Sequence, residues 1–310
     1  MSARVLAFGE VLWDRLPSGK RLGGAVLNFA VRMAGLGERA LVASRLGADG
    51  LGDEAMRRMQ ALGLDTRLVQ RDGERATGTV DVKLDAEGVP DFTINPDAAY
   101  DRIEPTDELL VEAAGAECIC FGTLSQRSTV SQETCARVLA AAGDAVKLLD
   151  INLRRDCYTP ETVRDSLDRA DVLKLNEDEL AELGDDFGPA TGLVSRVAAL
   201  NESFRLRLCV VTLGGRGALA VPREGPPVYE PGYRVAVADT VGSGDAFTAG
   251  FAHKYLAGAD LAECCRYGNA LGALVATQPG GTEPIGEDDV TAFLAEARER
   301  VGESSLGRSM

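Results

Sequence analysis

The chain alternates short apolar runs with longer segments in which apolar residues recur every three or four positions. The first pattern is typical of a buried strand and the second of an amphipathic helix, as in the segment with Ala55, Met59 and Leu62. The predicted strands are 5–8, 40–46, 118–121, 146–149, 172–175 and 208–212. The predicted helices are 28–34, a segment around 55–62, 129–141, 160–169 and 176–183. Short strands separated by helices predict an α/β fold with a mostly parallel sheet covered on both faces.

Two segments interrupt this alternation. Residues 12–22 place Pro17, Ser18 and Gly19 between apolar positions, which indicates a turn inside a hairpin. Residues 78–95 alternate apolar and polar positions on either side of a turn at Glu87 and Gly88. We expect both segments to form antiparallel strands that stand off the main sheet as a small lid. Residues 1–302 are then expected to form one domain, and residues 303–310 a frayed tail.

Composition narrows the choice of partners. A formal charge of -15, from 48 acidic and 33 basic residues, disfavours nucleic acid or an anionic membrane. The N-terminus lacks the apolar stretch of a signal peptide, and no apolar run approaches about 18 residues. The seven cysteines have no regular disulfide spacing, which predicts reduced thiols in the core. We therefore expect a cytoplasmic globular protein.

The single histidine restricts the chemistry further. A site with several histidine ligands is excluded, and a Ser-His-Asp or Cys-His hydrolase would have to use His253. Because His253 lies in a helical stretch, we expect it to be structural. Catalysis must then depend on carboxylates, backbone amides, hydroxyls or a bound cation.

The strongest local motif is DTVGSGDAFTAGF, residues 239–251. Gly242, Ser243 and Gly244 allow successive N–H groups to point into one concavity, and a helix is predicted to follow to about Leu256. A glycine-rich turn before a helix N-terminus favours an anion such as phosphate. Asp245 would repel that anion, so it fits the role of a base that accepts a hydroxyl proton. An aspartate that only caps the helix is the alternative, and the segment alone leaves both open.

A second motif covers residues 21–55, RLGGAVLNFAVRMAGLGERALVASRLGADGLGDEA. Gly23 and Gly24 permit close backbone approach, and Asn28 begins a helix from which its amide can reach a ligand. Considered alone, this is a strand–helix unit punctuated by glycines, and packing would explain most of it.

Together the two motifs resemble the two signatures of the ribokinase-like, or PfkB, family of carbohydrate kinases, and the resemblance covers nearly the whole chain. It implies a three-layer α/β/α sandwich with a small β-strand lid. It also implies transfer of the γ-phosphate of ATP to a sugar hydroxyl, with Asp245 as the base and the turn of Gly242, Ser243 and Gly244 at the phosphoryl group.

The same resemblance assigns the other site residues one by one. On the sugar side it implies Asp14, Gly24, Asn28, Asn152 and Arg154, and it places Asp150 of the same DINLR segment near the phosphates and sugar. On the nucleotide side it implies Asn176, Thr212, Gly214, Gly217, Asn269 and Gly280. Glu179 of the NEDE motif would organise Mg²⁺ with Asn176, often through water, and Asp239 with the carbonyl of Val241 would bind K⁺. Each residue has a plainer structural alternative; Asn176 and Glu179, for instance, could merely begin a helix.

Three rival functions are disfavoured. GRGALA, residues 215–220, matches a dinucleotide fingerprint, but Val221 and Pro222 leave no room for the helix that must receive the pyrophosphate. No Walker motif occurs. A non-catalytic sugar or nucleotide sensor would not need Asp245 beside the glycine turn.

The substrate is predicted from resemblance alone. GEVLWD, DAAYDRIEP and FGTLSQRS are most similar to fructokinase-like members, so we expect fructose to be phosphorylated to fructose 6-phosphate. Ribose, 2-keto-3-deoxygluconate and nucleosides remain alternatives. Exposed lid strands often pair between subunits in relatives, which makes a homodimer one expectation.

Overall fold

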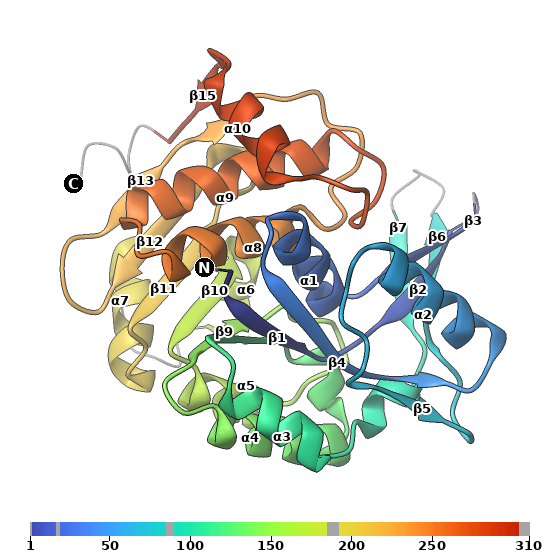
Figure 1. Ribbon diagram of the computed structural model, residues 1–310. Helices are drawn as coiled ribbons and strands as arrows, with labels where there is room; N and C mark the ends of the chain where they lie inside the picture. Colours follow the sequence, from blue (N-terminus) through green and yellow to red (C-terminus); the bar gives the residue numbers. More distant parts are fainter. Residues whose placement is uncertain (1, 17–18, 85–89, 185–191, 304–310) are drawn as a thin grey trace.

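The computed structural model describes residues 2–16, 19–84, 90–184 and 192–303. Its centre is a nine-stranded sheet in the order β13-β12-β11-β10-β9-β8-β1-β4-β5 (Figure 1). The strands are β1 (Arg4–Phe8), β4 (Arg39–Gly47), β5 (Val69–Asp72), β8 (Cys118–Phe121), β9 (Val146–Asp150), β10 (Val172–Asn176), β11 (Leu208–Thr212), β12 (Ala218–Pro222) and β13 (Val228–Glu230). All pairs from β11 to β5 are parallel, which confirms the predicted class.

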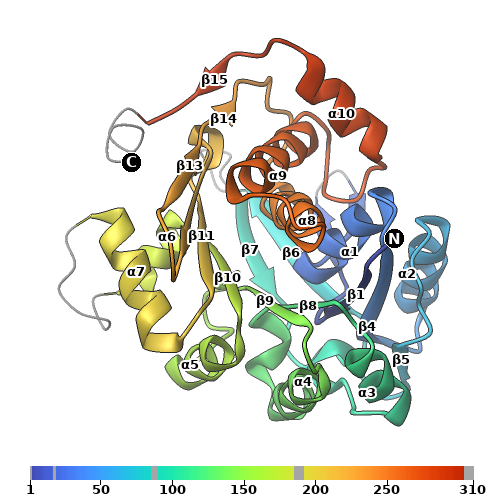
Figure 2. The ribbon, with the colours of Figure 1, turned by 60° about the vertical axis from the view of Figure 1, so that its left-hand side comes forward.

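Helices cover both faces of this sheet, so the three-layer α/β/α sandwich is confirmed (Figures 1 and 2). One face carries α1 (Ala25–Gly35), α2 (Gly50–Ala61), α8 (Ser243–Leu256) and α9 (Leu261–Ala276), with α10 (Glu287–Ala295) outside α9. The other carries α3 (Asp107–Ala114), α4 (Thr129–Ala141), α5 (Pro160–Arg169), α6 (Glu177–Glu182) and α7 (Leu193–Phe204). Alternate strand residues point to opposite faces, so Leu6 and Phe8 pack under α3 and α4 while Val5 and Ala7 pack under α1.

The lid is a separate four-stranded sheet in the order β3-β2-β6-β7. Its strands are β2 (Leu12–Leu16), β3 (Gly19–Gly23), β6 (Gly78–Leu84) and β7 (Pro90–Ile94). Each hairpin is antiparallel as expected, but β2 and β6 pair in parallel. The reason is topological, because β2 follows β1 and β6 follows β5, and both leave the same edge of a parallel sheet. The expected turn at Glu87 and Gly88 lies outside the described residues.

The structure also bears on the cysteines, on His253, on membrane spans and on the GRGALA segment. The seven cysteines are buried and unpaired. His253 is hydrogen-bonded through Nδ1 to Glu38, at 2.8 Å, and has a structural role. None of the described helices is both long enough and apolar enough to cross a membrane. The GRGALA segment forms a short 3₁₀ turn, η3 (Gly214–Arg216), and then β12 instead of a helix.

Glu303, the last residue that the structure describes, is bound to the rest of the domain. Glu303, counted above with the tail, donates its N–H to the Tyr229 hydroxyl at 2.7 Å and forms an ion pair with Arg216. Residues 304–310 lie outside the described part.

Candidate active site

The predicted site residues gather where the parallel strands end. Asp150 ends β9, Asn176 ends β10 and Thr212 ends β11. The carboxyl ends of parallel strands share one edge of a sheet, and ligands of open α/β folds bind outside that edge. The N-terminus of α8 and the lid complete this site.

The turn from Gly242 to Asp245, called here the anion turn, leads into α8. Gly242 has a φ of 77°, and a β-carbon there would lie 2.6 Å from Cα of Gly281, so the position requires glycine. The Ser243 N–H donates to the Thr240 carbonyl at 3.2 Å. The N–H groups of Gly244 and Asp245 lie in the first turn of α8. No carbonyl within the helix can accept a hydrogen bond from them. They are therefore available to an anion, and the helix dipole favours one.

Asp245 lies beside these amides and is held by one side chain. Nδ2 of Asn28, a buried residue of α1, donates to Asp245 Oδ2 at 2.7 Å across 217 positions of sequence. Burial, and then the charge of Asp150, raises the pKa of Asp245 to about 6, although the Asn28 bond, Lys174 and Arg154 oppose the shift. A carboxylate with this pKa is largely ionised at neutral pH and can accept a proton.

A buried network supports the first turn of α8. Lys174 of β10 is paired with Asp150, with Nζ at 3.0 and 3.2 Å from the two carboxyl oxygens. The Thr248 hydroxyl donates to Asp150 Oδ2 at 2.7 Å and contacts the Gly244 carbonyl at 2.9 Å. Burial lowers the pKa of Lys174, but Asp150, Glu179 and Asp245 outweigh this effect and raise it, so the amine stays charged. The network fixes α8 relative to β9 and β10.

The sugar-side residues approach from the lid and the β9 end. Burial raises the pKa of Asp14, on β2, to about 6, against the opposing charges of Arg154 and Arg21. Asn152 has a φ of 42°, in the left-handed region that asparagine adopts more readily than most residues. Arg154 also lowers the pKa of Asp245, so its charge acts on both carboxylates. Asp14 on the lid and Asp245 at the anion turn are thus both within reach of the Arg154 charge.

The NEDE segment forms a capping box. The Asn176 side chain accepts from the Glu179 N–H, and Glu179 Oε2 accepts from the Asn176 N–H, both at 2.8 Å. Glu179 Oε1 accepts from the Leu153 N–H at 3.1 Å. Burial raises the pKa of Glu179 despite Lys174. The helix-start alternative is thus present in the structure, and it ties α6 to the segment after β9.

The described residues contain no group of three or more His, Cys, Asp or Glu side chains that could hold a metal ion. Asn176 and Glu179 offer one amide oxygen and one carboxylate, a small donor set that fits Mg²⁺, because this ion usually keeps several waters and binds chiefly through the phosphates of its nucleotide. Glu179 and Asn176 would then act on the metal through water, as the resemblance implies.

The nucleotide-side residues divide into two groups. Gly217 has a φ of 102° and adjoins the Glu230 carbonyl, where a β-carbon would lie at 2.0 Å. Asn269 donates to that carbonyl at 3.1 Å, so it lies with the loop of Gly214 and Gly217 after Thr212. Gly280, expected in the same region, instead donates its N–H to Asp239 at 3.1 Å. It therefore lies beside the anion turn.

A family model described as pfkB family carbohydrate kinase matches residues 18–288. The chain belongs to the pfkB family of carbohydrate kinases. It is 34% identical over 263 residues to a fructokinase of Klebsiella pneumoniae, covering 81% of this chain and 83% of that enzyme. It is also 29% identical to a 2-dehydro-3-deoxygalactonokinase of Haloferax volcanii, covering 99% of this chain and 100% of that one.

Solved structures agree on the fold of this kinase. A double-mutant fructokinase from Vibrio cholerae, in its fructose, ADP and potassium ion bound form, superimposes with a TM-score of 0.81. The superposition covers 94% of this chain and 98% of the other at 24% identity. The ribokinase-like fold predicted from the sequence is confirmed.

Four charged residues that the sequence analysis does not select lie in or beside the site of this kinase. Lys174 is the one charged residue of β10 and lies between Leu173 and Leu175. A charge inside an apolar run indicates a paired or functional group, and it could have been found in the sequence. Glu10, 3% exposed, accepts the Ala25 N–H at the start of α1, and burial raises its pKa to about 7. Arg21 and Arg32 contact Asp239 and the loop around Gly281. Both arginines lie within the second motif, residues 21–55, but nothing in that motif distinguishes them from surface arginines.

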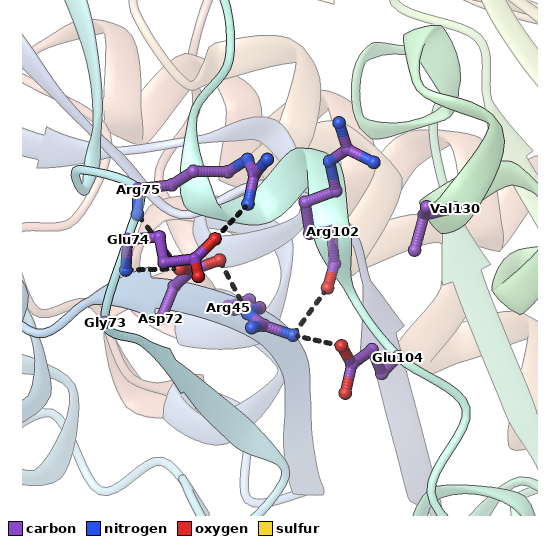
Figure 3. A pocket seen from close by; sticks show the side chains of 8 residues that line it. All are labelled: Arg45, Asp72, Gly73, Glu74, Arg75, Arg102, Glu104 and Val130. Carbon is purple, nitrogen blue, oxygen red and sulfur yellow. Dashed lines mark hydrogen bonds and ion pairs between the residues drawn. The ribbon is translucent and has the colours of Figure 1, made fainter.

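A second concavity of the kinase lies away from these residues. A cavity of about 540 Å³ is lined by Arg45, Asp72, Gly73, Glu74, Arg75, Arg102, Glu104 and Val130 (Figure 3). Arg45 pairs with Asp72 and with Glu104, at 3.0 Å each, so much of its charge is neutralised internally. None of the predicted site residues lines it. The chemistry described above belongs to the sheet edge, not to this cavity.

Proposed function

We propose that this kinase transfers the γ-phosphate of ATP to the primary hydroxyl of fructose and forms fructose 6-phosphate. Membership of the pfkB family supports the phosphotransfer. The Klebsiella pneumoniae fructokinase, the more identical of the two relatives above, supports the sugar.

The observation that carries the proposal is the placement of Asp245. The Asp245 carboxylate, with a pKa raised to about 6, lies beside the first-turn N–H groups of Gly244 and Asp245. Asn28, a predicted sugar-side residue, holds this carboxylate by a 2.7 Å hydrogen bond. Phosphoryl transfer needs positioning and charge stabilisation more than covalent chemistry, and this arrangement supplies both.

The residues divide the work as follows. Asp14 orients the sugar by accepting hydrogen bonds from its hydroxyls, with Asn152 and Arg154 alongside. Asp245 accepts the proton of the attacking sugar hydroxyl. The hydroxyl oxygen then bonds to the γ-phosphorus as the bond from that phosphorus to the ADP oxygen breaks. The amides of Gly244 and Asp245 hold the charge that develops on the phosphoryl oxygens. Asn176 and Glu179 would hold a nucleotide-bound Mg²⁺ through water, and the ion would supply charge neutralisation at the phosphates.

One observation favours a second substrate class, the 2-keto-3-deoxy sugar acids. Arg154 forms no ion pair with the residues of the described ranges, and its charge reaches both Asp14 and Asp245. Such a guanidinium would pair with the carboxylate of a sugar acid. The Haloferax volcanii relative is named for a substrate of that class.

A substrate panel tests the proposal. Fructose, ribose, 2-keto-3-deoxygluconate and adenosine are each assayed for ADP formation, and the product is examined by NMR for the position of the phosphate. We expect the highest kcat/KM with fructose and a phosphate at the primary hydroxyl. A higher kcat/KM with the sugar acid would replace fructose by the second class. No turnover with any of the four would contradict the proposal.

A further inference from the structure

Asp239, the residue expected to bind K⁺, already has a positive partner. Arg21 lies on lid strand β3, and its Nη1 is 2.7 Å from Asp239 Oδ2. The same oxygen accepts the Gly280 N–H at 3.1 Å, and Oδ1 accepts the Val241 N–H at 3.0 Å. Both carboxylate oxygens are therefore engaged by donors.

A second arginine engages the loop that follows α9. Arg32 of α1 is 1% exposed, donates Nη2 to the Gly281 carbonyl at 2.6 Å, and donates Nη1 to the Glu283 carbonyl. A hard cation needs several oxygen ligands at once, and here a carboxylate and two nearby carbonyls accept hydrogen bonds from guanidinium groups. A cation bound to Asp239 would also lie next to the charge of Arg21. The arrangement does not fit a K⁺ ion held by Asp239.

We propose that Arg21, supported by Arg32, replaces the monovalent cation beside the anion turn, so that this kinase needs no K⁺. Arg21 is a positioning residue: it holds Asp239, and Asp239 lies three residues before Gly242 of the anion turn. The inference rests on the anion turn being the phosphoryl site.

The position of Arg21 adds a consequence that a metal ion would not have. In the lid, Arg21 is paired in register with Asp14, and its charge lowers the pKa of that carboxyl. One side chain therefore lies between the predicted sugar ligand and the anion turn. The arrangement of the anion turn then depends on the lid position.

The Arg21–Asp239 pair contributes little to folding stability, because the Arg21 side chain is 39% exposed and exposed ion pairs contribute little. Variants at Arg21 should therefore fold. Arg15→Met is a matched control, since Arg15 and Asp81 form an ion pair of the same 2.7 Å length within the lid, away from Asp239.

The first test uses the unaltered enzyme in K⁺, Na⁺ and tetramethylammonium buffers. We expect the same kcat, within about a factor of two, and the same melting temperature in all three, since no cation is bound. Activation by K⁺ of about tenfold or more, or a K⁺-specific rise in melting temperature, would overturn the proposal.

The second test uses Arg21→Met and Arg15→Met in the same buffers. Loss of a charged hydrogen bond predicts a fall of about ten- to a hundredfold in kcat for Arg21→Met, with the fold retained. Because the Asp239 oxygen is then free, K⁺ should restore part of the activity more than tetramethylammonium does. Arg15→Met should have the kcat of the unaltered enzyme, and its kcat should be the same in all three buffers.

An Arg21→Met enzyme as active as the unaltered one, or inactive without any effect of K⁺, would contradict the proposal. The melting-temperature comparison needs no turnover. A failure of the substrate proposal, seen as no ADP formation with any sugar, is thereby kept apart from a failure of the cation proposal.

Discussion

Asp245 and Glu179 are both carboxylates in the first turn of a helix, and both lie under the influence of Lys174. Their oxygens are used differently. Both oxygens of Glu179 accept backbone N–H groups, from Asn176 and Leu153. Asp245 accepts one bond, from the Asn28 side chain, and no residue of the described ranges donates to its other oxygen.

The comparison separates two uses of a carboxylate at a helix start. The charge of Glu179 is used to join α6 to the segment after β9, and changing it should disturb the fold. Asp245 keeps an oxygen free, and its environment raises its pKa toward neutrality, which suits proton transfer. Substitutions at four carboxylates test this distinction.

The largest expected effect is that of Asp245→Asn. The amide keeps size and most hydrogen bonds but cannot accept the proton, so kcat should fall by about 10²–10⁴-fold, while ATP and sugar affinities stay near normal. Steady-state kinetics and ligand titrations measure both. Asp260→Asn is the control, because Asp260 caps α9 outside the site and asparagine caps equally well.

Glu10→Gln tests a third carboxylate, one that touches the site only through α1. Burial raises the pKa of Glu10 to about 7, above the 4.5 of an unburied glutamate, so its stabilising contribution is full below pH 4.5 and is lost as the pH rises through 7. The unaltered protein should lose up to about 3 kcal/mol of unfolding free energy over that window that the variant does not lose. Urea unfolding at several pH values measures this, and parallel pH curves for the two proteins would refute it.

Asp14→Ala tests whether Asp14 binds the sugar. Removing a charged hydrogen-bonding partner costs about 1.5–3 kcal/mol, so the sugar KM should rise roughly ten- to a hundredfold, and the ATP KM much less. Initial-rate measurements with each substrate varied in turn decide the matter. Equal effects on both KM values would indicate a general folding defect instead.

Glu179→Gln is the counterpart of Asp245→Asn. One buried N–H would then face the side-chain amide, so the unfolding free energy should fall by about 1–3 kcal/mol. If Glu179 also organises Mg²⁺, turnover should fall and the Mg²⁺ concentration for half-maximal rate should rise. A variant that loses stability with an unchanged Mg²⁺ dependence and rate would assign Glu179 to the fold alone.

The sequence predicts six of the parallel strands because each is a short apolar run, but it misses the edge strand β5, whose sequence VQRD is mostly polar. It does not predict the antiparallel β12 and β13, or helices α3, α7 and α10, whose patterns are weaker. Within the site, the family resemblance selects both Asn28 and Asp245, and the structure joins them. It also names Asp150 and Asp239, but not their contacts with Lys174, Thr248 and Arg21, because contacts across 98 and 218 residues depend on how strands and lid are ordered in space.

The central claim is that Asp245 is the proton acceptor, and the pH dependence of kcat tests it most directly. For the unaltered enzyme, kcat should fall with the ionised fraction of Asp245 as the pH drops through about 6, since burial and Asp150 raise its pKa to that value. Asp14 also has a pKa raised to about 6, so the two proteins are compared in kcat at saturating sugar, where binding by Asp14 does not limit the rate. In Asp245→Asn the acidic limb of kcat should be absent, and the residual rate should be low across the range. An Asp245→Asn enzyme that keeps the same limb, or turns over sugar at the unaltered rate, would contradict the account.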